Sequence, residues 1–207
     1  MNNEILKNIS YGVYVVSTIN NEKSTGCIAN SIMQVTQDTI AISINHNNFT
    51  NECIKKSKKV AISILSQDIE DNIIPIFGFQ TGREVDKFKN IEKINIDDID
   101  IIKNSIGYLI CEIVDSLETS THSVFLGKIV NGDVLNNNKI PMTYAYYHEV
   151  KKGLSPKNAP TYIEPQKETG YKCSICGYLY KGDITKEPDN YICPICKQNK
   201  SVFKKVD

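Results

Sequence analysis

Four cysteines near the C-terminus form two Cys-x-x-Cys motifs, CSIC at residues 173–176 and CPIC at residues 193–196. Residues 177–192 separate the motifs, a spacing that lets each pair of thiolates bind one side of a single metal ion. Four sulfur ligands in a tetrahedral arrangement suit zinc or iron. The identity of the metal therefore decides whether this segment is an electron carrier or a structural zinc ribbon.

Aromatic residues around the motifs favour iron, although the spacing alone is more typical of structural zinc. The segment 171–207 is too short for an ordinary hydrophobic core, so a bound metal must supply much of its folding free energy. An aromatic shell excludes water and tunes the potential of an iron centre, whereas structural zinc has no potential to tune. The aromatic residues are Tyr171, Tyr178, Tyr180, Tyr191 and Phe203.

The strings YKCSICGYLYKGD and YICPICKQNKSVF closely resemble rubredoxin. The resemblance implies one iron ion bound by Cys173, Cys176, Cys193 and Cys196. It has three departures: a shorter span between the motifs, Tyr191 where tryptophan is usual, and Lys197 where glycine is usual. If the second motif keeps the turn that glycine allows in the first, Lys197 must adopt a positive φ at about 1 to 2 kcal/mol.

The 207 residues provide one domain of ordinary size and a small metal module. No apolar run of 18 residues predicts a membrane span, and the first residues do not resemble a secretory signal. An odd number of cysteines, seven, with four committed to a metal, predicts a reducing cytoplasm. Cys27, Cys53 and Cys111 are interpreted as small buried hydrophobic residues.

The net charge is zero, but it is unevenly distributed. Residues 171–207 hold seven lysines and four acidic residues, which leaves an acidic excess in residues 1–170. Opposite signs favour docking of the small module on its own body or on an acidic partner, although solvated surface lysines explain the pattern equally well. A basic patch strong enough to indicate nucleic-acid binding is missing from the sequence.

The first 152 residues predict a mainly β body with short helices. Alternating, β-branched stretches predict the strands, Asn20 to Lys23 predicts a hairpin turn, and the order of elements favours a barrel. Neither a Gly-x-Gly-x-x-Gly nor a Walker A motif occurs. Strands are expected at 11–17, 39–44, 60–65, 107–117 and 123–135, and helices at 49–58 and 68–77.

A proline-rich stretch separates the body from the metal module. Three prolines fall within residues 156–165, which predicts an extended, semi-rigid spacer. The expected domains are residues 1–152, a linker at 153–170 and the metal module at 171–207.

Two stretches of the body have side chains suited to a ligand. The small and amide residues at 27–31 and 34–36 are expected in a loop between strands, where the backbone could approach a flat ligand. Residues 45–50 lead into the first helix with Thr50 as the expected N-cap, so that free N–H groups could bind a phosphate. A plain surface loop and an ordinary helix cap would have similar sequences.

Several separated motifs in the body resemble the flavin reductase family: YGVYVVST at 11–18, GCIANS at 26–31, QVT at 34–36, FGF at 77–79, GREVDKF at 82–88 and THSVFLG at 121–127. The resemblance implies a split β-barrel, generally dimeric, that holds FMN near the subunit interface. His122 would lie on the nicotinamide or substrate side as the catalytic candidate; a hydrogen-bonded structural histidine is the alternative. The implied cofactor residues are Ala29, Asn30, Ser31, Gln34, Val35 and Thr36 for the flavin, Asn48 and Thr50 for the phosphate, and Arg83, Lys87 and Phe88 close by.

The fusion of a flavin body to a C-terminal rubredoxin is similar to the high molecular weight rubredoxins of anaerobic bacteria. This resemblance implies a flavin-dependent oxidoreductase that passes electrons from FMN to the Fe(Cys)4 centre. The implied donor is NAD(P)H or an NAD(P)H-dependent rubredoxin reductase. The implied acceptor is a flavodiiron protein that reduces oxygen or nitric oxide, a role in oxidative stress. The alternative is a flavin- or ligand-binding barrel whose zinc ribbon is an interaction module.

Overall fold

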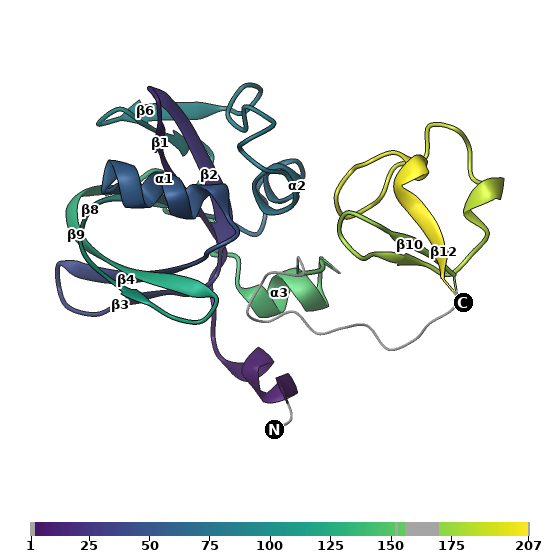
Figure 1. Cartoon of the computed structure of the whole chain (residues 1–207), viewed down its shortest axis with the longest axis horizontal. Coiled ribbons are helices and arrows are strands. Elements are labelled where there is room, and N and C mark those ends of the chain that lie inside the picture. The colour runs from purple at the N-terminus through teal and green to yellow at the C-terminus, as the bar shows by residue number, and fades with distance from the viewer. Residues whose placement is uncertain (1–2, 152, 156–169, 207) are drawn as a thin grey trace.

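The computed structural model describes residues 3–151, 153–155 and 170–206, which form two units (Figure 1). The N-terminal unit consists mainly of strands, and the C-terminal unit (residues 170–206) carries both cysteine motifs. The C-terminal unit lies on the side of the molecule where α2 (Ile73–Phe79) and α3 (Tyr144–Glu149) are found. No helix among the described residues is long and apolar enough to cross a membrane. Most of the expected linker, residues 156–169, lies outside the described residues.

A seven-stranded antiparallel sheet forms the body of the N-terminal unit. Its strand order is β2-β1-β5-β8-β9-β4-β3. The strands are β1 (Tyr14–Asn20), β2 (Lys23–Ala29), β3 (Ile32–Gln34), β4 (Thr39–Asn45), β5 (Lys59–Ile64), β8 (Gly107–Glu118) and β9 (His122–Val134).

The sheet curves into a half-barrel around one hydrophobic cluster. Side chains from strands that are well separated in the sheet order, including Val16, Ile42, Ile62 and Phe125, pack together and are almost completely buried. Ile54 of α1 (Phe49–Ser57) joins this cluster and covers its open side. The alternation of buried and partly exposed residues in β4 places one face of the strand on this core. The expected mainly β fold is confirmed.

The turn between β1 and β2 is the expected one. Asn21 and Glu22 both have positive φ, 46° and 67°, and the flanking Asn20 and Lys23 pair across the hairpin. Two central residues with positive φ match the right-handed twist of the strands. This turn therefore fixes the register of the strand that ends at Ala29.

A second core lies beneath α2 and α3 and includes Val13, Phe77, Phe88 and Tyr147. The hairpin of β6 (Lys93–Ile96) and β7 (Ile99–Ile102) packs through Ile99 and Ile101 on residues of β5 and β8. The short 3-10 helix η1 (Asn3–Asn8) precedes the sheet.

Three sequence-based expectations for this unit need correction. The second helix starts at Ile73, not at residue 68, because Pro75 fits only the first turn of a helix. The expected loop at 27–31 begins later, since Cys27 to Ala29 belong to β2 and pair with β1. The strands β3, β6 and β7 and the helix α3 were not expected, being short or interrupted by charged residues.

The C-terminal unit is a three-stranded sheet with the order β11-β10-β12. Its strands are short, so the unit has little sheet surface on which to build a core. Its elements are β10 (Gly170–Cys173), β11 (Leu179–Tyr180), β12 (Phe203–Val206) and the 3-10 helices η2 (Ile184–Lys186) and η3 (Lys200–Val202).

Candidate metal centre and adjoining cavity

The four predicted ligand cysteines lie together in the C-terminal unit. Their Sγ atoms are all within 4.8 Å of one another, and the side chains are buried. The Sγ atoms of Cys173 and Cys196 are 3.6 Å apart, as are those of Cys176 and Cys193. A disulfide would place two sulfur atoms about 2 Å apart, whereas sulfur ligands at the corners of a tetrahedron about 2.3 Å from a metal lie about 3.8 Å apart. The geometry fits a metal bound by four thiolates.

The two cysteine motifs have the same backbone geometry. The N–H of Gly177 donates to the carbonyl of Cys173, and the N–H of Lys197 donates to the carbonyl of Cys193, each over 2.9 Å. Gly177 and Lys197 have φ values of 82° and 59°. Lys197 therefore adopts the left-handed conformation expected from the sequence, although it carries a side chain.

Aromatic and aliphatic side chains enclose the cysteines. Tyr191 contacts both Tyr180 and Phe203 in edge-to-face geometry, with ring centroids 5.7 and 5.9 Å apart. Phe203 is itself buried against the cysteine cluster. This apolar shell excludes water from the sulfur atoms, as the sequence predicted for an iron centre.

One residue of this shell comes from the N-terminal unit. Phe79, the last residue of α2, packs against the cluster that contains the four cysteines. The pKa of Tyr147 in α3 is raised by burial first and by the charges of Tyr144 and Cys176 to a smaller extent. The N-terminal unit thus contributes one side chain, Phe79, to the apolar surroundings of the metal site.

A cavity of about 660 Å³ lies where α1, α2 and the C-terminal unit meet. This volume is in the range of small-molecule and cofactor sites. Phe79 and Gly82 line it from the N-terminal unit, and Ile175 and Gln198 line it from the C-terminal unit. Ile175 lies between the two cysteines of the first motif, so the metal site and the cavity share a wall.

The first turn of α1 borders the cavity and offers backbone N–H groups. Asn47, Asn48 and Thr50 line the cavity, as expected for a phosphate site. The helix N-cap is Asn48, not Thr50, and the Asn48 side chain makes no capping hydrogen bond. Thr50 is the second residue of the helix, within its first turn, and is only 2% exposed. The expectation of an N-cap at Thr50 was wrong because the helix starts at Phe49.

Arg83 is not among the residues that line the cavity, although its chain neighbours Gly82 and Glu84 are. Its guanidinium is 4.6 Å from the ring centroid of Phe49, which lines the cavity, and it forms an ion pair with Glu52. The guanidinium therefore holds the rim residue Phe49 in place.

Lys87 is a buried cation in the cavity wall. Its Nζ donates to the carbonyl of Gly26 over 2.8 Å and to that of Phe77 over 3.3 Å. Burial lowers the pKa of Lys87 to about 8, and the nearby Cys27 opposes this shift. Burial also raises the pKa of Cys27, against the influence of Lys87 and of a hydrogen bond with Thr50.

Most of the other predicted flavin residues lie outside this cavity. Asn30 lines an adjoining apolar crevice with Phe79, and its buried Nδ2 has no hydrogen-bond partner among the described residues. Phe88 lies in the core with its ring centroid 4.9 Å from that of Phe77. Packing in the core is therefore sufficient to explain an aromatic residue at this position. Ala29 ends β2, and Ser31, Gln34, Val35 and Thr36 lie on or beside β3 at the edge of the sheet.

His122 begins β9, near the N-terminal end of α1. It pairs with Asn45 of β4, and its Nδ1 is 2.7 Å from the hydroxyl of Thr121. Burial and the neighbouring His46 lower the pKa of His122. His122 is not among the residues that line the cavity. Its catalytic role and its alternative role as a structural histidine both stay predictions.

Sequence reasoning did not find the residues that join the two units. Phe79, Ile175 and Gln198 contribute to the shared wall, and Tyr147 lines a groove beside it. Only the FGF string at 77–79 and the positions next to cysteines could have indicated them.

Comparison with known proteins divides the chain in the same place as the structure. Residues 6–155 match the family model described as a flavin reductase like domain. Residues 171–204 match the model described as a rubrerythrin, rubredoxin-like domain.

Two curated proteins are similar over most or all of the chain. A high molecular weight rubredoxin of Moorella thermoacetica is 33% identical and aligns over 100% of both chains. A ferric-chelate reductase (NAD(P)H) of Archaeoglobus fulgidus is 32% identical over 79% of this chain and 99% of the relative.

Solved structures share the fold of the N-terminal unit. An NADH:FAD oxidoreductase of Streptomyces globisporus superposes with a TM-score of 0.62 at 19% identity, over 67% of this chain and 84% of the other. Flavoredoxin of Methanosarcina acetivorans gives 0.56 at 19% identity, over 60% and 69%.

Proposed function

Because the chain belongs to the flavin reductase like family and is a flavin-dependent oxidoreductase with a rubredoxin-like C-terminal unit, we propose that it passes electrons from an NAD(P)H-linked donor through FMN to iron. The shared wall carries this proposal. Ile175 separates two metal-ligand cysteines and also lines the cavity beside α1 and α2. Iron bound by the cysteines and flavin bound in the cavity would therefore be neighbours within one chain.

The residues present fit both groups. When bound, FMN supplies two-electron or one-electron chemistry, and iron accepts one electron at a time. Cys173, Cys176, Cys193 and Cys196 would hold the iron within the aromatic shell. The protein's own contributions are the distance between the sites, the exclusion of water and the charges around each site.

The first turn of α1 is the proposed phosphate site of the flavin. The side chain of Asn48 is not engaged in capping, and the helix N-terminus favours an anion. A compact terminal phosphate, as in FMN, fits such a site. The charged Lys87 in the same cavity adds a positive potential.

A homodimer is proposed from the outer face of the sheet. Met33 pairs with Ala41 and Ala41 with Leu126, while Leu117 pairs with Val124, so that these side chains form rows on one face. Met33 and Leu117 are 64% and 66% exposed. A second copy covering this face would also bring the predicted flavin residues at β3 to an interface. Light scattering should give the mass of a dimer, and Leu117→Glu should shift it toward a monomer.

The donor and acceptor are proposed from chemistry and from relatives. NAD(P)H, direct or through a reductase, fits the name of the Archaeoglobus relative, a ferric-chelate reductase (NAD(P)H). The basic excess of the C-terminal unit favours an acidic acceptor such as a flavodiiron-type protein. Reduced thiolate ligands favour a reducing compartment such as the cytoplasm.

Anaerobic stopped-flow mixing with NADH or NADPH tests the function. The flavin absorbance should fall first and the visible iron band second, at a rate independent of protein concentration. Zinc-substituted protein is the matched control, because it keeps the four thiolates and removes the one-electron acceptor. A flavin-reconstituted protein whose iron stays oxidised while its flavin is reduced would contradict the proposed transfer.

A further inference from the structure

The second cysteine motif contains a backbone conformation that its sequence does not favour. Lys197 occupies the position that Gly177 occupies in the first motif, with the same hydrogen bond and a φ of 59°. A residue with a side chain is strained in this conformation, and glycine is not. Glycine would therefore suit the metal site better, so the Lys197 side chain needs a reason outside that site.

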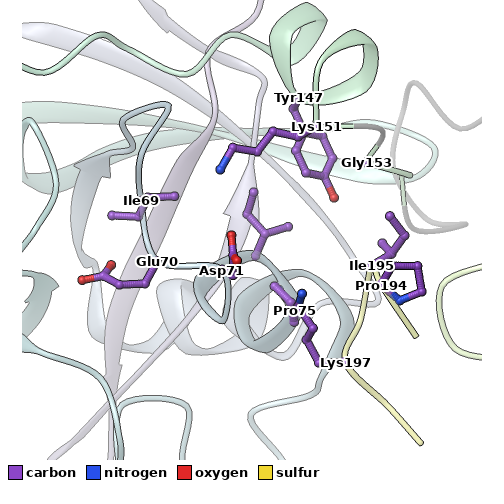
Figure 2. Close-up of a pocket in the computed structure, with 11 residues that line it drawn as sticks. Ile69, Glu70, Asp71, Pro75, Tyr147, Lys151, Gly153, Pro194, Ile195 and Lys197 are labelled. Carbon is purple, nitrogen blue, oxygen red and sulfur yellow. The ribbon is translucent and has the colours of Figure 1, made fainter. Parts of the chain in front are cut away.

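The Lys197 side chain lies in a groove between the two units (Figure 2). Pro194 and Ile195, from the same motif, line this groove from the C-terminal unit. Pro75 of α2 and Tyr147 of α3 line it from the N-terminal unit. The contact is apolar at these residues, which is typical of a docking surface.

The charges that line the groove favour contact between the second cysteine motif and the residues before α2. Glu70 and Asp71, which precede α2, line the groove together with Lys197. Two lysines also line the groove: Lys151 belongs to the N-terminal unit and Lys197 to the C-terminal unit. Opposite charges on two docking faces orient the encounter and lose strength as salt increases.

We propose that Lys197 is a docking residue that holds the second cysteine motif against the acidic start of α2. It thereby keeps the metal site beside the cavity. This inference rests on the proposed function, because it assigns the surface through which the two redox sites of one chain approach each other. Lys197 acts by positioning the C-terminal unit, because its side chain lies in the groove and the four clustered cysteines are the metal ligands.

The magnitudes are compatible with a modest effect. Among the described residues Lys197 forms no ion pair within 4.0 Å, so its attraction to the carboxylates that share the groove is at most that of an exposed ion pair, about 0.2 to 1 kcal/mol. This changes a docking equilibrium by at most about 1.5- to 5-fold. The strain is borne by the metal module, whose folding depends on the much larger binding free energy of the metal. The substitution Lys197→Gly should therefore have opposite effects on the module and on docking.

The first experiment measures docking without electron transfer. Full-length, zinc-substituted protein is treated with a zero-length carbodiimide, and cross-linked peptides are identified by mass spectrometry. A cross-link from Lys197 to Glu70 or Asp71 is expected within one chain, with a yield that falls about 2- to 5-fold between low and high salt. Its absence, while other lysine–carboxylate pairs such as Lys200–Asp189 react, would overturn the proposal.

The second experiment compares variants of the full iron- and flavin-loaded chain. Lys197→Gly should release iron to a chelator up to about 5- to 30-fold more slowly, because the strain is removed. The same variant should reduce its iron about 2- to 5-fold more slowly at low salt, with flavin reduction unchanged. Lys197→Arg should keep the wild-type rate, and Lys204→Gln, which removes a charge on β12 outside the groove, should be neutral.

The two hypotheses fail differently. If wild-type iron is never reduced by the flavin but the Lys197 cross-link forms, the relay is wrong and the docking assignment stands. If iron is reduced and Lys197→Gly leaves both the rate and its salt dependence unchanged, the relay stands and the docking role of Lys197 is wrong.

Discussion

The ammonium group of Lys87 lies 2.8 Å from the carbonyl oxygen of Gly26, in the wall of the cavity beside the metal site. This bond joins the segment after α2 to β2. It also keeps a positive charge buried, which lowers the folding stability by an amount that depends on pH.

Stability of the flavin-free protein should rise with pH as Lys87 deprotonates. Its pKa is about 8 in the folded protein and 10.5 ordinarily, so between these values the unfolded chain binds the additional proton. The unfolding free energy should therefore increase over this window by on the order of 3 kcal/mol. Urea denaturation of the wild type and Lys87→Met, measured across the window, isolates this contribution. Lys89→Met, at an exposed neighbour, should retain the wild-type slope.

Iron should be the metal in protein made in iron-replete cells. The expected result is one iron per chain and a visible charge-transfer band that bleaches with dithionite. Stoichiometric zinc without such a band would instead support a structural ribbon. Cys193→Ser should abolish or severely weaken binding because it removes one of four ligands.

Removal of the metal should unfold the C-terminal unit and spare the N-terminal one. The C-terminal unit has only short strands, and its apolar cluster is assembled around the cysteines. The N-terminal unit has its own clusters. NMR spectra of the full chain before and after chelation should show loss of dispersed signals from residues 170–206 alone. Broad loss of signals from the half-barrel would contradict this independence.

Asn48→Ala should weaken FMN binding by about 5- to 30-fold, the effect of losing one hydrogen bond to a charged group. Asn48→Asp should weaken it further through repulsion. Because the Asn48 side chain makes no capping bond, the thermal stability of the flavin-free protein should change little. Flavin titration and thermal unfolding of each variant make the test. If Asn48→Ala lowered the thermal stability of the flavin-free protein as strongly as the FMN affinity, Asn48 would have only a structural role.

Asn51 should be important for the position of α1. Its Nδ2 donates to the carbonyl of Ile44 over 2.9 Å and to the hydroxyl of Ser123 over 3.0 Å, and it is 2% exposed. Asn51→Ala removes the side-chain donor to the Ile44 carbonyl, while the Ser123 hydroxyl keeps its hydrogen bonds to the Glu118 carboxylate. We expect a loss of about 1 to 3 kcal/mol in unfolding free energy. Lys56→Ala, on the exposed side of the same helix, should be nearly neutral. A similar stability of both variants would contradict the role of Asn51.

The metal site could be predicted almost completely from the sequence, because its ligands lie in two short local motifs. The strained φ of Lys197 was also predictable, since the first motif shows which turn the second must adopt. The main strands were predictable from alternation, but the start of α2 required attention to Pro75. The β6–β7 hairpin was not predictable because Lys93 and Asp100 interrupt its apolar pattern.

The cavity could be predicted only in part. Asn48, Thr50 and Lys87 line it, and their assignment to a flavin stays a prediction. Ile175 and Phe79 meet across the two units, and no local pattern encodes a contact between distant segments. Met33 and Val35 are exposed at the sheet edge, so a single chain shows no ligand contact for the residues near β3.

If the cavity holds the flavin as proposed, Ile175 links the two sites thermodynamically. Metal binding orders the motif that contains Ile175, and Ile175 completes the cavity, so metal binding must alter the affinity of a ligand in that cavity. By reciprocity, the ligand alters the metal affinity by the same factor. Loss of iron would then loosen the flavin, and a damaged molecule would lose both redox groups together.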